Sequence, residues 1–359
     1  MLLIPQETTT AQLISTKGQF WASGLTGNDP PQNQSSFESS IGYIPTLSLL
    51  RDLSGSRLID MEWAYRLDRS YSADSLLNKH ENHHRLWVRY SSEKFEARLG
   101  LQKIVFGPSQ ILRTLSWFDT IDLEDPTGQT DGVEAFRLRV FPSNSLSIWS
   151  WLINSNQDTI SFGGRVELST GLGEWGFTYH QDPTAATQAV GQIPVIISGP
   201  HQRVALDHRY DGYFGFWFEG AGFFVDNQRD AELDRYALVT LGADYTIPVG
   251  PGLLVMTETI RIHGWASEND STSEQTYSAF MIILPVGMLH QLMLITQVDW
   301  DNSRTYNYIR WSTTYDRFSL NFILSMNPGR IDYGSSQEAL PNTVAGFGTG
   351  LQFMFIYNH

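Results

Sequence analysis

Five carboxylates fall within one stretch of the sequence between two predicted strands. They are Asp119, Asp122, Glu124, Asp125 and Asp131, and Arg113 precedes them. Carboxylate oxygens can bind Ca²⁺, and Asp122, Glu124 and Asp125 are weak candidates for this, but their spacing is not that of a known calcium loop. We therefore predict no metal site here. A more general role for such a cluster is electrostatic, because rings of charged side chains filter and orient solutes in a narrow passage.

Charged residues also alternate along the predicted strands around this stretch. A strand sends successive side chains to opposite faces, and in "RLIDMEWAYRLDRSY" (57–71) one face is charged while the other is apolar and aromatic. This alternation places a set of charged residues on the wall of a lumen: Asp60, Glu62, Arg66, Arg85, Arg89, Arg98, Glu134, Arg137 and Arg139. An acidic segment facing a largely basic wall would create a transverse field at the narrowest point. The same charges could instead form salt bridges that fix the segment in place, and the two roles are compatible.

Other groupings of reactive residues predict no catalysis. "HENHH" (His80–His84) could bind Zn or Cu through imidazole, but it lies in a predicted long loop beside a strand and we expect no metal there. The motifs G-x-S-x-G and H-E-x-x-H and the P-loop are absent from the sequence. His208, His263 and His290 lie on separate predicted strands. We therefore expect no enzymatic activity and no cofactor.

Composition excludes several further classes of protein. The chain has 359 residues and no cysteine, which excludes disulfides, thiolate metal sites and haem attachment through C-x-x-C-H. The net charge of −14 disfavours binding to nucleic acid. No apolar run approaches the length of a transmembrane helix. The start "MLLIPQETTTAQ" lacks the basic region of an intact signal peptide, so it is either the remnant of one or a mature chain with a start Met.

The dominant pattern is period-two alternation in about eighteen segments of roughly ten residues, separated by turn residues. "FSLNFILSM" (318–326), for example, places Phe318, Leu320 and Phe322 on one face and Ser319 and Asn321 on the other. One segment fits poorly, because "GLLVMTETIRIH" (252–263) puts Glu258 on the face of Met256 and Ile260 unless a bulge intervenes.

The connections alternate between short and long, which is typical of a membrane barrel with short periplasmic turns and long outside loops. We predict an all-β protein, a closed antiparallel transmembrane β-barrel of about 16 to 18 strands, with 18 expected. Residues 1–359 would form one domain, with 1–16 as an N-terminal segment. The apolar residues Ile104, Phe106, Leu112 and Trp117 predict that 104–132, the third long connection, folds inward as a constriction loop. The alternative is a large soluble all-β sandwich or propeller, which must bury all these apolar faces elsewhere.

This architecture resembles the general and substrate-selective porins of Gram-negative bacteria along nearly the whole chain. "RLGLQKIVFG" (98–107) is similar to the stretch that opens the third loop in phosphate-selective porins, although the Lys-rich ladder of a phosphate channel is absent. The aromatic-rich final strand is also similar to that of outer-membrane barrels, apart from the terminal His359. The resemblance implies an integral protein of the bacterial outer membrane, with a periplasmic N-terminus, a third loop that narrows the barrel and a possible homotrimer.

The predicted function is a porin that contacts outer-membrane lipid and lets small hydrophilic solutes or ions diffuse passively, filtered by size and charge at the third loop. An alternative is a barrel scaffold that sheaths a partner, either a surface lipoprotein or a multihaem cytochrome. A fatty-acid channel fits less well, because it needs an apolar lumen and an N-terminal plug, and a charged inner face and a short N-terminal segment are predicted here.

Overall fold

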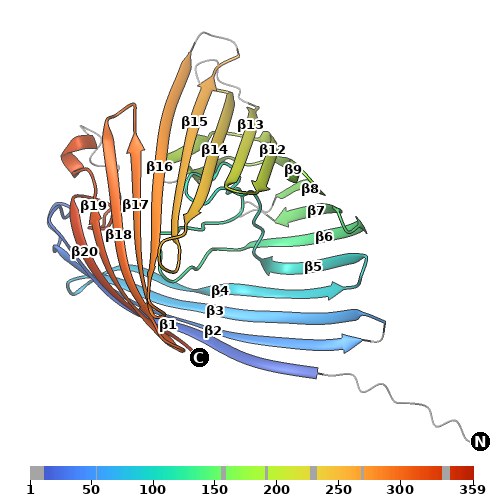
Figure 1. Cartoon of the computed structure of the whole chain (residues 1–359), viewed down its shortest axis with the longest axis horizontal. Coiled ribbons are helices and arrows are strands. Elements are labelled where there is room, and N and C mark those ends of the chain that lie inside the picture. The colour runs from blue at the N-terminus through green and yellow to red at the C-terminus, as the bar shows by residue number, and fades with distance from the viewer. Residues whose placement is uncertain are drawn as a thin grey trace, which may run out of the picture.

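The protein is a closed antiparallel β-barrel (Figure 1). The computed structural model describes residues 12–53, 55–154, 159–190, 193–226, 233–267, 271–333 and 340–359. Eighteen strands form one sheet, which closes because β1 pairs with both β2 and β20. They are β1 (Gln12–Gly27), β2 (Phe37–Leu53), β3 (Arg57–Ser72), β4 (Ser75–Ser91), β5 (Phe95–Gln102), β6 (Val133–Ser143), β7 (Leu146–Asn154), β8 (Ile160–Thr170), β9 (Gly173–Asp182), β12 (His201–Asp211), β13 (Gly215–Val225), β14 (Arg235–Ile247), β15 (Leu253–Trp265), β16 (Thr272–Val286), β17 (His290–Asp299), β18 (Arg304–Thr314), β19 (Phe318–Met326) and β20 (Thr349–Asn358).

These strands confirm the predicted fold and the expected number of strands. Each predicted segment corresponds to one barrel strand, and short turns join the strands at one end of the barrel. Closure pairs the backbone of the first and last strands, so this sheet has no free edge. β1 begins at Gln12, within the predicted N-terminal segment 1–16, and residues 1–11 lie outside the described residues. Among the described residues, no helix is long and apolar enough to cross a membrane.

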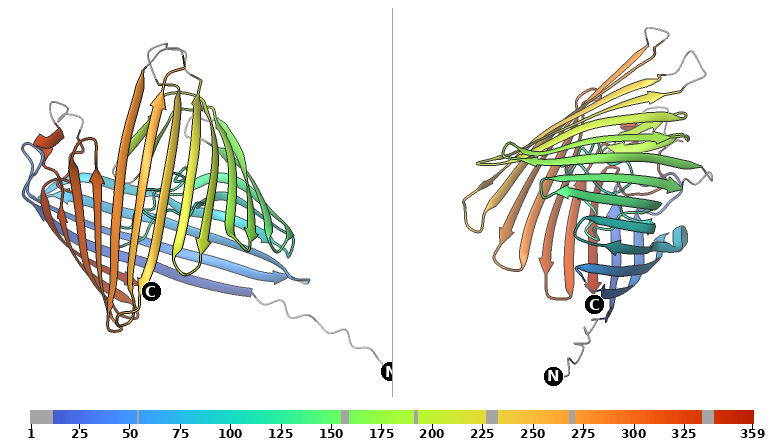
Figure 2. Two further views of the ribbon diagram at one scale, coloured as in Figure 1. Left: turned by 45° about the horizontal axis from the view of Figure 1, so that its top comes forward. Right: turned by 90° about the vertical axis from the view of Figure 1, so that its right-hand side faces the viewer.

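Two predicted long connections are largely strand. Residues 68–84 were expected to be a loop, but β3 and β4 continue to a turn between Ser72 and Ser75, so His80–His84 lie in β4 (Figure 2). Apart from Tyr71, Leu76 and Leu77 near the turn, the large side chains of this extension are polar on both faces, so it lacks the alternation that marked the other strands. Cross-strand ion pairs such as Arg69–Glu81, at 3.1 Å, support it instead.

The other such connection, between β9 and β12, contains the hairpin of β10 (Ala186–Val190) and β11 (Ile193–Ile197). Val195 and Ile197 of this hairpin are buried in the interior cluster, which includes Ile104 and Phe223. The hairpin therefore fills part of the barrel interior. The sequence pattern did not predict this.

The two faces of the strands differ as the alternation predicts. On β19, Phe322 is 51% exposed on the outer face, whereas Asn321 is buried on the inner face. β15 is an instructive exception, because its pairings contain no register shift and Glu258 lies inward with Met256 and Ile260. The inner face of β15 can be apolar because residues that lie inside the barrel, such as Leu112, cover it.

Residues 103–132, hereafter the inner segment, connect β5 to β6 and contain no strand. In Figures 1 and 2 this teal segment lies within the ring of strands. Its side chains and backbone contact the inner faces of strands far from β5 and β6, including β13, β15, β17 and β1. The barrel therefore has an obstructed lumen.

Candidate functional site: the inner segment and the charged wall

The inner segment packs its apolar residues against one side of the barrel interior. The ring of Phe106 stacks on Trp151 of β7 at 5.8 Å between centroids, and the ring of Phe118 lies 4.9 Å from that of His180 on β9. Trp117 lies edge-on to Phe223 of β13 at 6.1 Å. Removing these rings from water stabilises the inward position, which explains why so apolar a connection does not extend into solvent.

Two buried carboxylates of the wall, Glu219 on β13 and Glu258 on β15, hold the backbone of the inner segment. We call this pair the carboxylate clamp. Its donors are the N–H groups of Ser109 and Leu115 to Glu219, and of Gln110, Ile111 and Leu112 to Glu258, at 2.6–3.1 Å. A buried backbone N–H group without an acceptor costs free energy comparable to a lost hydrogen bond. The clamp therefore satisfies five backbone donors in a place where water could not easily replace it.

Further contacts complete the clamp. The indole Nε1 of Trp217 donates to Glu258 at 3.1 Å, and the hydroxyl of Thr240 on β14 donates to the carbonyl of Leu112 at 2.8 Å. Gly107 has a φ of 90°, and a Cβ there would collide with the carboxyl group of Glu219. Only glycine fits this turn without strain. These contacts specify one path for the backbone of residues 107–115.

Arg113 and Asp119, which were predicted to line the constriction, form a buried ion pair with each other. Asp119 also accepts a hydrogen bond from the N–H of Ile121 at 3.2 Å. A buried pair of this kind is neutral overall, and removing one partner leaves the other charge uncompensated. The geometry of these two residues supports a role in shaping the inner segment.

Asp122, Glu124 and Asp125 form the acidic part of the inner segment. Asp122 accepts the N–H of Glu124 at 2.8 Å, and Glu124 accepts the amide of Gln297 on β17 at 3.0 Å. Arg310 on β18 donates to the carbonyl of Leu123, at 3.4 Å, but among the described residues no cation lies within 4.0 Å of these three carboxylates. Burial raises the pKa of Glu124 to about 7, and burial also raises the pKa of Asp122.

The described residues contain no group of three or more His, Asp or Glu side chains that could hold a metal ion. Asp125 instead accepts hydrogen bonds from the N–H and hydroxyl of Thr127, at 2.8 and 2.6 Å. These contacts are those of a turn that hydrogen-bonds its own backbone.

The last part of the inner segment returns along β1 and β4. The amide of Gln129 donates to Gln19 of β1 at 2.7 Å, and its oxygen lies 3.0 Å from Nε2 of His84. Arg85 of β4 donates to the carbonyl of Thr130 at 2.6 Å. Asp131 is 69% exposed and lies 3.9 Å from Arg66. The inner segment thus contacts strands on opposite sides of the barrel.

Five arginines of the inner wall are paired with carboxylates on the same strand or on strands one or two positions away. Asp60 of β3 contacts Arg89 of β4 at 2.7 Å, and Glu167 of β8 contacts Arg139 of β6 and Arg165 of β8, each at 2.9 Å. Pairs of this kind connect six strands near the end with the short turns. We call the set the charge belt: Asp60, Arg89, Glu96, Arg98, Arg137, Arg139, Arg165, Glu167 and Asp207.

Two sets of predicted residues are placed differently from the expectation. Glu134 lies on the outer face of β6, where it accepts from Asn154 at 3.2 Å, because its position alternates with those of Arg137 and Arg139. The histidines of "HENHH" do not converge. His80 contacts Asp68, and His84 contacts Gln129. The pairing of β3 with β4 shifts register between Ala64 and Tyr65, beside these histidines. The remaining wall residue, Glu62, shares the inner face of β3 with Asp60.

The sequence analysis missed both carboxylates of the clamp and the belt residues Glu96, Arg165, Glu167 and Asp207. Glu258 carried a usable signal, since it is an isolated acidic residue in an otherwise apolar row with Met256 and Ile260. Such a residue needs a buried partner.

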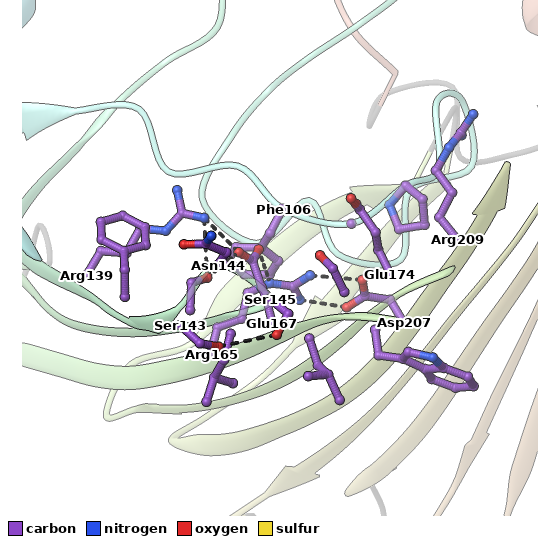
Figure 3. A pocket seen from close by; sticks show the side chains of 18 of the residues that line it. Phe106, Arg139, Ser143, Asn144, Ser145, Arg165, Glu167, Glu174, Asp207 and Arg209 are labelled. Carbon is purple, nitrogen blue, oxygen red and sulfur yellow. Dashed lines mark hydrogen bonds and ion pairs between the residues drawn. The ribbon is translucent and has the colours of Figure 1, made fainter. Parts of the chain in front are cut away.

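Cavities lie on both sides of the inner segment. One of about 530 Å³ is lined by Asp122, Glu124 and Asp131 of the segment and by Thr187 of β10. The other, of about 750 Å³, lies beneath Phe106 on the side of the short turns and is lined by charge-belt residues including Arg139, Glu167 and Asp207 (Figure 3). The inner segment therefore lies between a cavity lined partly by its own acidic residues and a cavity lined by the charge belt.

No protein-family model and no curated protein matches this sequence. The structure is nevertheless similar to solved outer-membrane porins. OccK2 (OpdF) of Pseudomonas aeruginosa matches with a TM-score of 0.62 at 9% identity, over 96% of this chain and 97% of that chain. OccAB1 of Acinetobacter baumannii matches with 0.61 at 10% identity, over 96% of each chain. OpdK of P. aeruginosa, solved with vanillate, matches with 0.60 at 8% identity, over 96% and 98%. The fold is that of a Gram-negative porin-type barrel.

Proposed function

We propose that this protein is an outer-membrane channel through which small hydrophilic solutes diffuse passively, and that the inner segment filters them by size and charge. The observation that carries the proposal is the inner segment itself, which lies inside a closed barrel between two cavities whose linings both contain charged side chains. A barrel of eighteen strands is too wide for its own side chains to fill, so the segment sets the width of the remaining passage.

The faces of the barrel support a location in the outer membrane. Large apolar side chains are exposed on the outer face, among them Leu99, Leu152 and Phe353. Charged side chains are concentrated on the inner face. Lipid outside and water inside is the arrangement that makes both faces favourable. The N-terminus would then be periplasmic. By analogy with porins, we propose that the protein forms a homotrimer.

The scaffold alternative requires a lumen wide enough for a partner lipoprotein or cytochrome. The contacts of the inner segment with β13, β15 and β17 occupy that space. They weigh in favour of a channel over a sheath.

Single-channel recording of the purified protein in planar bilayers tests the proposal. We expect stable conductance steps with a defined ion selectivity, and a variant that lacks residues 109–124 should give larger steps because the passage widens. Protein that has been boiled and unfolded serves as the blank. A silent bilayer, with protein shown to be folded by its altered gel migration before boiling, would contradict the proposed channel.

A further inference from the structure

Three arginines of the charge belt lie side by side on adjacent strands. In the pairing of β4 with β5, Arg89 is directly opposite Arg98, and in the pairing of β5 with β6, Arg98 is directly opposite Arg137. Like charges at directly opposed positions destabilise a sheet. This row is therefore possible only if a counter-charge lies within reach of all three side chains.

Glu96 supplies that counter-charge. It lies on β5 on the same face as Arg98, and its carboxylate is 2.5 Å from Arg137, 3.2 Å from Arg89 and 3.6 Å from Arg98. Asp60 is a second carboxylate partner of Arg89 and accepts two hydrogen bonds from it, of 2.7 and 2.8 Å. Two carboxylates, Glu96 and Asp60, thus partly compensate three arginines that lie next to one another on adjacent strands.

Glu167 has the same role further along the wall. It accepts from Arg139 and Arg165, and Asp207 binds Arg165 at 2.6 and 2.9 Å. Figure 3 shows these side chains pointing toward one another along the floor of the 750 Å³ cavity. Aromatic rings cover the same guanidinium groups, with Arg139 at 4.4 Å from the ring of Trp149. The charge belt contains five arginines and four carboxylates, so it is close to neutral.

We infer that Glu96 and Glu167 determine the charge selectivity of the channel by masking the arginines of the wall, so that a solute meets a nearly neutral belt and anions are not favoured. This inference rests on the proposed function. It predicts that cations and anions differ in permeability chiefly through the acidic part of the inner segment, and that the arginines act on anions only once their carboxylates are removed. Glu96 and Glu167 are thus specificity-determining residues of a wall that looks anion-selective in the sequence.

Reversal potentials in a KCl gradient test the inference. Glu96→Gln keeps the size of the side chain and uncovers positive charge at the wall, and we expect the cation-to-anion permeability ratio to fall roughly threefold to tenfold. Adding Arg137→Gln to that variant should restore the ratio toward that of the wild type. Glu134→Gln is the matched control, because it removes a carboxylate from the outer face of β6 and should leave the ratio unchanged.

If Glu96→Gln does not fold, Glu167→Gln makes the same test with Arg139 and Arg165. The inference is overturned if the wild-type channel strongly prefers anions, or if both glutamate variants conduct with the wild-type ratio. A wild-type protein that is folded and silent overturns the proposed function, and the inference falls with it. Conduction by the wild type with unchanged selectivity in the variants overturns the inference alone.

Discussion

The carboxylate clamp gives the sharpest test of how the inner segment is held. Glu258 is fully buried and accepts four hydrogen bonds, from the N–H groups of Gln110, Ile111 and Leu112 and from the indole of Trp217. In Glu258→Gln, one carboxylate oxygen becomes an NH₂ group that cannot accept. At least two of the four donors then lose their acceptor inside the barrel.

The cost follows from these contacts. A buried donor without a partner costs about 1–3 kcal/mol, so two of them weaken docking of the inner segment by about 2–6 kcal/mol. Since about 1.4 kcal/mol is a factor of ten in an equilibrium constant, the ratio of docked to undocked segment falls by roughly 30-fold to 10⁴-fold. We expect the variant to show added conductance levels and larger open-channel noise in single-channel recordings. Glu219→Gln, which affects Ser109 and Leu115, should act in the same direction.

Glu274→Gln provides the control, because Glu274 is exposed on β16 and pairs with Arg261 and His263 outside the lumen. Its conductance histogram and noise should match those of the wild type. The reasoning about the clamp is refuted if Glu258→Gln and Glu219→Gln, singly and together, are folded and give the wild-type conductance and noise.

Three further outcomes are expected. Burial raises the pKa of Glu124 to about 7, so acidification from about pH 8 to about pH 5.5 protonates it and the cation-to-anion permeability ratio should fall. A ratio that stays constant with pH, or the same fall in Glu124→Gln, argues against this. The double variant Asp122→Asn, Glu124→Gln should shift reversal potentials toward anions, and reversal potentials equal to those of the wild type would show that these carboxylates do not face the passage. Asp119→Asn should mainly destabilise the inner segment, because Arg113 loses its buried partner. Leu99→Arg on the outer face should lower the free energy of unfolding in bilayers by about 2–4 kcal/mol if it lies near the bilayer centre; no loss of stability in urea titrations would contradict a lipid-facing position.

The composition of the wall and of the inner segment could be predicted only in part. Arg89, Arg98 and Arg137 lie on the inner face, as the alternation predicts, whereas Glu134 lies on the outer face because its position differs in parity from those of Arg137 and Arg139. The sequence analysis left open whether these arginines face the passage or form salt bridges, and it could not name their partners. Their partner Glu96 is two residues from Arg98 in the sequence, but its contacts with Arg89 and Arg137 depend on the register of three strands.

The sequence by itself determined the number of strands, the apolar outer face and the end of the barrel at which the long connections lie. These features are local: side chains alternate with period two along each strand, and turn residues mark each end. Only the tertiary structure decided what faces what across the lumen. Gln110 and Glu258 are 148 positions apart, and they meet because closure of the sheet brings β15 opposite the root of the inner segment. Contacts between residues that are distant in the sequence determine the strand pairing around a closed barrel and the path of a segment inside it. A local sequence pattern therefore cannot predict them.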